Sequence, residues 1–307
     1  NGNGSVDIKT TNGSITVATV NGIAGINADG TGNVALAASG SNKDVIINNA
    51  INSVAGEVNI LASRNISVGA DITTSGNTFL QATTGSISGA ANVAANKLAI
   101  TAGSTIGTIN SRLKTNVTNL GVSAGGDVYV TEANDITVAG KTTTNGSLLI
   151  ETTNGVLTVD QFDQAPSVNS NASGFSGASS PSNAISGLVA NGNGKVVLTA
   201  KGIAKDVVVN QTVTSGSGEV NILASGNLNV RADIVTNGNA FMQASAGTIS
   251  GTGTLAVTNL ALTAGSGIGT SAARCHSGAP SDFSNSTAVT NSALSASELK
   301  NWADMMV

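Results

Sequence analysis

The chain repeats itself over a long distance, and this repeat is the strongest constraint on its fold. Residues 33–112 align without a gap on residues 195–274, and 43 of these 80 positions are identical. The block from Gly56 to Ser63 recurs unchanged from Gly218 to Ser225. The chain therefore consists of two long repeats, at about 4–145 and 146–274, and the second copy carries about 20 inserted residues.

A shorter unit recurs inside each long repeat. It reads Gly, Asn or Thr, any residue, apolar, any residue, apolar, any residue, then Ala or Thr, and it begins at positions 4, 32, 56, 76, 96, 118, 146, 194, 218, 238 and 258. Alternation of apolar and polar residues in short segments closed by Gly or Asn-Gly predicts strands and turns. A period of about 20 residues that keeps its register predicts a solenoid, in which each coil buries its apolar face on its neighbours.

We therefore expect an all-β fold, a right-handed parallel β-helix (β-solenoid) with coils of about 20 residues, continuous over 1–274. Val, Ile, Leu and Ala should form inward ladders, and Gly and Asn should occupy the corners, where positive φ is needed. Parallel strands about 4.8 Å apart make 11 coils a rod of roughly 50 Å. The alternative is a Gly/Ser-rich β-sandwich, but a sandwich needs no repeat that keeps its register.

The composition excludes several classes of partner. A net charge of −4 with 13 Lys and Arg residues provides no basic surface for nucleic acid or anionic lipid. No apolar run approaches the roughly 18 residues that a membrane span needs, so we expect no membrane insertion. The single Cys275 excludes an internal disulfide and a cysteine-built zinc site. The chain opens in the middle of a repeat without a leader, so we expect a piece of something longer.

The Gly-x-Val-x-Ile-x-Ala units, such as Gly56–Ala62 and Gly218–Ala224, resemble those of filamentous-haemagglutinin-like adhesins. These are large bacterial exoproteins released by two-partner secretion or as autotransporter passengers. The resemblance covers about residues 4–274 and implies a secreted or cell-surface rod for adhesion, aggregation or matrix building. The chain departs from the family in having no visible secretion module and no Arg-Gly-Asp; the nearest segment is Arg231-Ala232-Asp233.

Two segments leave the repeat. The insertion near 160–187 is expected to be a loop at a coil corner, and loops on rigid scaffolds often bind ligands; its candidate ligand residues are Phe162, Asp163 and Phe175. A neutral decoration is the alternative. The tail, 275–307, has capping-box spacing at Ser295 and Glu298 and a helical apolar stripe, so we expect a short helix that caps the rod or joins copies. The candidate cap or self-association residues are Leu299, Trp302 and Met306.

No catalytic, cofactor-binding or metal-binding residue is predicted. A polysaccharide-degrading β-helix needs clustered acids on one face, whereas the acids here are scattered, and Asp44, Glu57 and Asp71 simply recur at Asp206, Glu219 and Asp233. Lys43-Asp44 is expected to be a solvated corner pair. Adjacent Cys275 and His276 in an irregular tail do not suit a nucleophile pair.

The sequence therefore predicts no enzyme and no cofactor, but an extracellular structural protein that builds a cell-surface fibre or filament for adhesion, aggregation or matrix formation. Its favoured partner is itself, in an end-to-end homopolymer. The alternative is a monomeric adhesin segment that binds glycans or other cells through the 160–187 loop. A polysaccharide-degrading enzyme ranks third.

Overall fold

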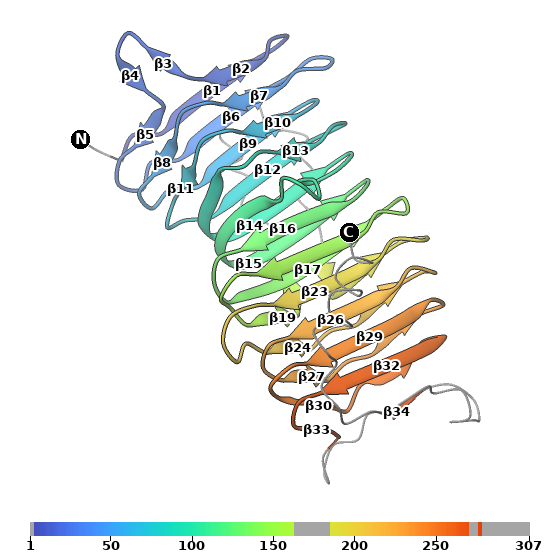
Figure 1. Ribbon diagram of the computed structural model, residues 1–307. Coiled ribbons are helices and arrows are strands. Elements are labelled where there is room, and N and C mark those ends of the chain that lie inside the picture. Colours follow the sequence, from blue (N-terminus) through green and yellow to red (C-terminus); the bar gives the residue numbers. More distant parts are fainter. Residues whose placement is uncertain (1–2, 163–184, 270–275, 278–307) are drawn as a thin grey trace.

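The computed structural model describes residues 3–162, 185–269 and 276–277, and every regular element in these ranges is a β-strand. The strands stack in parallel into a β-solenoid of about 11 turns with about 21 residues in each coil (Figure 1). The predicted fold class is therefore confirmed. The helix expected in the tail lies outside the described residues.

Each coil of the first half has one long strand on one side and two short strands, separated by a corner, on the other. The long strands are β1 (Val6–Thr10), β6 (Val34–Ala38), β9 (Val58–Ala62), β12 (Thr78–Ala82), β14 (Asn92–Ala102) and β15 (Leu113–Ala124). The short strands before the corner are β2 (Ile15–Val17), β7 (Val45–Ile47), β10 (Ile66–Val68) and β13 (Ile87–Ser88). Those after the corner are β5 (Ile26–Ala28), β8 (Ile51–Ser53) and β11 (Ile72–Thr73), while β14 and β15 include this position in their first residues.

The second half has the same coil plan. Its long strands are β16 (Val128–Glu132), β18 (Leu148–Thr152), β23 (Val196–Ala200), β26 (Val220–Ala224), β29 (Asn239–Ala244) and β32 (Asn259–Ala264). Its short strands are β19 (Leu157–Val159), β24 (Val207–Val209), β27 (Leu228–Val230), β30 (Thr248–Gly251) and β33 (Gly267–Ile268), then β22 (Leu188–Ala190), β25 (Val213–Ser215), β28 (Ile234–Thr236), β31 (Thr254–Ala256) and β34 (His276–Ser277). Between the halves, β17 (Ile136–Thr142) runs through the corner position as one strand.

The core is a set of ladders of like side chains. Val58, Ile60 and Ile100 are completely buried, as are their partners on neighbouring long strands. Because inward positions alternate with outward ones, each coil adds the same apolar residues to the interior. Aromatic residues are absent from this central ladder cluster, as expected for an interior this narrow.

The corners join each coil to the next through polar side chains. The backbone N–H of Asn65 donates to Oδ1 of Asp44 at 3.0 Å, and that of Ser86 donates to Oδ1 of Asn65 at 3.0 Å. The same bond recurs along the rod, always from a backbone N–H in the following coil, with the acceptors Asn3, Asn33, Asp44, Asn65, Asp71, Asp127, Asp135, Asn145, Asp206, Asn227 and Asp233. The Asn and Asp side chains at the corners thus satisfy backbone donors that lie outside the strand ladders.

Glycines are needed where corners stack most closely. A Cβ on Gly56 would lie 2.1 Å from the carbonyl oxygen of Gly32, and one on Gly218 would lie 2.1 Å from that of Gly194. The same carbonyls accept hydrogen bonds from buried hydroxyls: Ser53 donates to Gly32 at 2.7 Å and Ser215 to Gly194 at 2.7 Å. These corners therefore have no room for a side chain at the glycine position.

The two sides of the rod exchange roles between β15 and β17. β15 pairs with β17, so the side that carries long strands in the first half carries the short strands β19 and β22 in the second. On the other side, Ile106 bridges to Val128 of β16, so the ladder of β2, β7, β10 and β13 continues into long strands. The two halves of the rod, from β1 to β15 and from β16 to β32, therefore present their long strands on opposite sides.

Candidate functional site

The first coil exposes an apolar end of the rod, which we call the end surface and define by Ile8, Val20 and Ile23. β1 pairs with β6 along one edge, and no strand in the described ranges pairs with its other edge. Ile8 points inward in register with Leu36, yet 40% of Ile8 is exposed whereas Leu36 is completely buried. Strand edges that combine unpaired backbone with exposed apolar side chains are sites of strand association.

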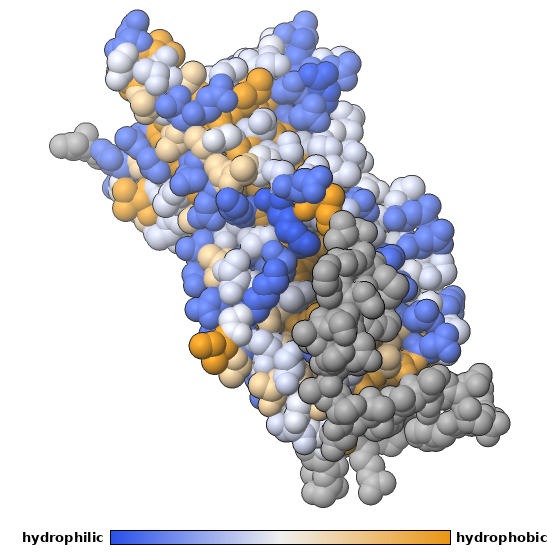
Figure 2. Space-filling view, viewed as in Figure 1, coloured by the Kyte–Doolittle hydropathy of each residue, from blue (hydrophilic) through white to orange (hydrophobic). Residues whose placement is uncertain are grey.

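A hairpin projects beside this edge and adds to the end surface. Its strands β3 (Thr19–Val20) and β4 (Ile23–Ala24) are antiparallel, and Asn21 and Gly22 turn with φ of 51° and 81°. Two central residues with positive φ form the tight turn that suits a two-residue hairpin. Val20 is 65% exposed and Ile23 75% exposed, and Figure 2 shows apolar colour on this projection at the upper left.

The base of the insertion is anchored on the outer face of a long-strand sheet. Gln161–Phe162 (β20) pairs antiparallel with Ile185–Ser186 (β21). Phe162, 3% exposed, and Ile185 form an apolar cluster with the outward side chains of Phe79, Ala99 and Ala139. Gly121 lies against the Phe162 ring, and a Cβ on this residue would lie 2.5 Å from the ring, so only glycine fits there. Packing thus fixes where the insertion leaves the rod.

A pocket of about 560 Å³ with both apolar and polar walls lies beside the segment 107–112, near the exchange of sides. Its lining residues include Asn92, Ser111, Arg112, Lys114 and Thr153. Two cations among hydroxyl and amide groups suit a small anionic or hydroxylated ligand. No described residue forms a hydrogen bond or ion pair with the Lys114 ammonium.

Glu151 lies beside this pocket and forms ion pairs with Lys201 and Arg112. Its Oε2 is 2.8 Å from Nζ of Lys201 and 3.7 Å from a guanidinium nitrogen of Arg112. Burial acts to raise the pKa of Glu151, but the hydrogen bond from Lys201 and the charge of Arg112 outweigh it, so the pKa lies below its usual value. Glu151 is therefore an ionised bridge and not a proton donor at neutral pH.

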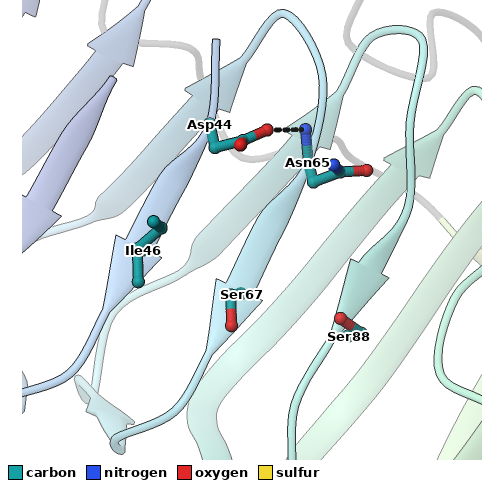
Figure 3. Close-up of a pocket in the computed structure, with 5 residues that line it drawn as sticks. All are labelled: Asp44, Ile46, Asn65, Ser67 and Ser88. Atoms are coloured by element: carbon teal, nitrogen blue, oxygen red, sulfur yellow. Dashed lines mark hydrogen bonds between the residues drawn. The ribbon is translucent and has the colours of Figure 1, made fainter. Parts of the chain in front are cut away.

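A second pocket, of about 420 Å³, follows the outward side of β7, β10 and β13 (Figure 3). Ile46, Ser67 and Ser88 come from these successive strands, and Asp44 and Asn65 close one end through their hydrogen bond. Asp44 also accepts two hydrogen bonds from Arg64, at 2.8 and 2.5 Å. The bond from Arg64 lowers the pKa of Asp44 to about 2, so this end of the pocket carries a fixed ion pair.

One buried carboxyl, Glu132, lies among the inward residues of the exchange region. It accepts hydrogen bonds from the Thr115 hydroxyl at 2.7 Å and from the backbone N–H groups of Val117 and Asn134, both at 3.1 Å. Burial raises the pKa of Glu132 even though these bonds oppose the shift. It is completely inaccessible, so its role is to satisfy backbone donors inside the rod.

The structure places only some of the residues that the sequence singled out. Phe162 packs on the outer face of the sheet, and its predicted contact with a ligand stays a prediction. The other candidates, Asp163, Phe175, Leu299, Trp302 and Met306, lie outside the described residues. The prediction that Lys43 and Asp44 form a corner pair is wrong, because Asp44 pairs with Arg64 in the next coil. His276 belongs to β34, which pairs with β31, and Cys275 is not described.

Groups of metal ligands and membrane-spanning helices are both missing from the described ranges. No group of three or more His, Cys, Asp or Glu residues there is arranged to hold a metal ion. Those ranges likewise contain no helix with the length and apolarity that crossing a membrane requires.

The chain was compared with protein-family models, curated proteins and solved structures, and none of the three comparisons found a match.

Proposed function

We propose that the chain is an extracellular structural protein, a β-solenoid unit of a surface fibre or filament used in adhesion, aggregation or matrix formation. In this proposal its partner is a second copy of itself, joined end to end, and it has no catalytic activity. The rod fold supports a mechanical role, because every coil repeats the same stacking contacts. The resemblance of its repeats to those of haemagglutinin-like adhesins supports the extracellular location.

The observation that carries the proposal is the end surface. Ile8 lies on β1, whose second edge has no partner in the described ranges, and Val20 and Ile23 lie exposed on the β3–β4 hairpin of the same first coil. Strand pairing with another coil would bury them and complete the backbone hydrogen bonds of that edge.

The test is electron microscopy and sedimentation of the purified chain and two variants. Ile23→Asp places a charge on the end surface, whereas Ile203→Asp changes an equally apolar residue, 91% exposed, at a corner on the side of the rod. We expect fibres from the parent chain and from Ile203→Asp, and single rods of roughly 50 Å from Ile23→Asp. Single rods from the parent chain at all concentrations, or fibres from all three, would refute the end-to-end assembly.

The anchored insertion supports a second function, that of a monomeric adhesin segment presenting the 160–187 loop to glycans or to other cells. Phe162 and Ile185 hold both ends of the insertion on the sheet, as a binding loop on a rigid scaffold requires. Replacing residues 163–184 by a short Gly-Ser linker should abolish binding to cells or glycan arrays and leave the rod intact. Unchanged binding would exclude this function, and turnover of acidic polysaccharides would favour an enzyme instead.

A further inference from the structure

We infer that successive copies in the filament are related by about half a turn around the rod axis, so that their insertions alternate between two opposite sides. This inference rests on the proposed end-to-end assembly. It follows from the positions of the first and last long strands, β1 and β32, and from the exchange of sides between them.

The two ends of the described rod offer matching strands. β1 has one paired edge, facing β6, and β32 has one paired edge, facing β29, within the part of the chain that the structure describes. The inward residues of β1 are Val6, Ile8 and Thr10, and those of β32 are Leu260, Leu262 and Ala264. Stacked in register, they would continue the apolar ladder that each long strand forms with the next, for example Val34, Leu36 and Ala38 on Val58, Ile60 and Ala62.

Inside the rod, a long strand stacks on short ones only where it spans the corner between them. β17, with seven residues, pairs with both β19 and β22 on either side of the corner. The five-residue β16 also spans a corner, since Val128 bridges to Ile106 before it and Val130 pairs with Leu113 after it. β33 and β34 offer β1 only two residues each, however, whereas β32 offers six residues in one run. A second copy therefore meets its best partner when its β1 lies on the long strand β32.

The ladders fix the rotation that this contact requires. From Val6, the register passes through Val34, Val58, Thr78, Leu98 and Leu120 to Val138, which is six turns. Half a turn further along the chain lies Leu148, and Val196, Val220, Ala240 and Leu260 follow at one turn each. β1 and β32 therefore lie on opposite sides of the rod, so a copy whose β1 stacks on β32 is turned by half a revolution.

The rotation determines how the filament displays its insertions. The insertion leaves the rod at Phe162, over the side that carries β12, β14 and β17. In the next copy this side faces the opposite way. With one more turn at the joint, each copy advances the filament by about 55 Å, and the same side recurs after about 110 Å.

Two measurements test the arrangement in a Cys275→Ser background. Helical reconstruction of the fibres should give a rotation of about 180° and a rise of about 55 Å per copy. For cross-linking, stacking in register places Asp7 of one copy beside Ala261 of another at the spacing of neighbouring strands, which a disulfide can bridge. Asp7→Cys with Ala261→Cys should therefore produce covalent ladders of copies on oxidation.

The matched control is Asp7→Cys with Thr263→Cys, which moves one thiol two residues along the same outward row and to about 8 Å, beyond disulfide reach. Fibres whose copies are not rotated, or cross-linking that does not distinguish the two pairs, would overturn the half-turn while leaving the end-to-end assembly in place. Absence of fibres and of any cross-link would remove both proposals.

Discussion

Val58 and Val220 hold the same position in the two long repeats, yet they are six and a half turns apart and enter the core from opposite sides of the rod. The ladder from Val58 reaches Val138 after four turns. Leu148 follows half a turn later, on the opposite side, and Val220 lies two turns beyond Leu148. The internal repeat is therefore a repeat of coil structure and not of the side that the coil shows to its surroundings.

The ionisation of Glu132 should make the stability of the rod depend on pH. Because burial raises its pKa in the folded state above the unfolded value, the folded state binds the proton more tightly. This contribution is present below the unfolded pKa and is lost as pH rises through the folded pKa. Glu132→Gln does not ionise at this position, so it should show a flatter stability profile than the parent between pH 4 and 8 in urea titrations.

The control for that experiment is Glu132→Ala, which leaves the buried donors of Thr115, Val117 and Asn134 without their acceptor. It should lower the free energy of unfolding by about 3 kcal/mol at pH 4, where the parent has the contribution of protonated Glu132, and by less as pH rises through the folded pKa. A parent chain with no pH dependence beyond that of Glu132→Gln would contradict the assignment.

The Asp44–Arg64 pair should contribute stability with the opposite pH dependence. The folded pKa of Asp44, about 2, lies below its ordinary value of 3.8, so its contribution is present above pH 4 and is lost as pH falls from about 4 to 2. Because Arg64 is 46% exposed, Asp44→Asn should cost roughly 1 kcal/mol or less at pH 7. The effect should shrink in 1 M salt.

Asp206→Asn is its matched control, because Gly226 stands where the first repeat has Arg64. Thermal melts at pH 2.5, 4 and 7 should show a smaller salt-dependent loss for Asp206→Asn. Equal salt-dependent losses at both sites would show that the arginine makes no contribution.

Gly218→Ala should destabilise the rod by about 1–3 kcal/mol, because the new Cβ would lie 2.1 Å from the Gly194 carbonyl oxygen and the stacked corners would have to separate. Gly267→Ala is the control, since a Cβ there meets no atom of the described residues within 4 Å. Chemical denaturation of both variants measures the difference. Equal stability of the two would mean that the corners separate without cost.

Ile60→Ala and Ile222→Ala should each cost about 2–5 kcal/mol, because both side chains are completely buried in the ladder. The two sites share no neighbour, so the double variant should show the sum within about 0.5 kcal/mol. Coupling in a solenoid is limited to adjacent coils. A double variant that loses much more than the sum in urea unfolding would show coupling across the exchange region.

The coil plan could be predicted from the sequence, but the exchange of sides could not. The alternation of apolar and polar residues predicts that Val58 and Ile60 point inward, and both are completely buried. The steps from position 4 to 32 and from 118 to 146 are each 28 residues, yet the first is one turn widened by the β3–β4 hairpin and the second is one and a half turns. Both sides use the same Val, Ile and Leu alternation, so spacing does not distinguish them.

The contacts of the candidate residues could not be predicted from the sequence either. Phe79, Ala99 and Ala139 occupy outward positions that the repeat leaves open to any residue, so only the fold shows that they form an apolar patch under Phe162. The partner of Asp44 was missed because Arg64 is 20 residues away and becomes a neighbour only through stacking.

The hydrogen bonds at the corners give the rod a direction of growth. Each Asp or Asn acceptor, such as Asn65, is completed by a backbone N–H of the coil that follows, here that of Ser86. A finished coil therefore presents a row of oriented acceptors to the segment that comes next. For a chain that is delivered amino-terminal end first, every newly arriving coil meets a prepared template, and folding proceeds vectorially, one coil at a time.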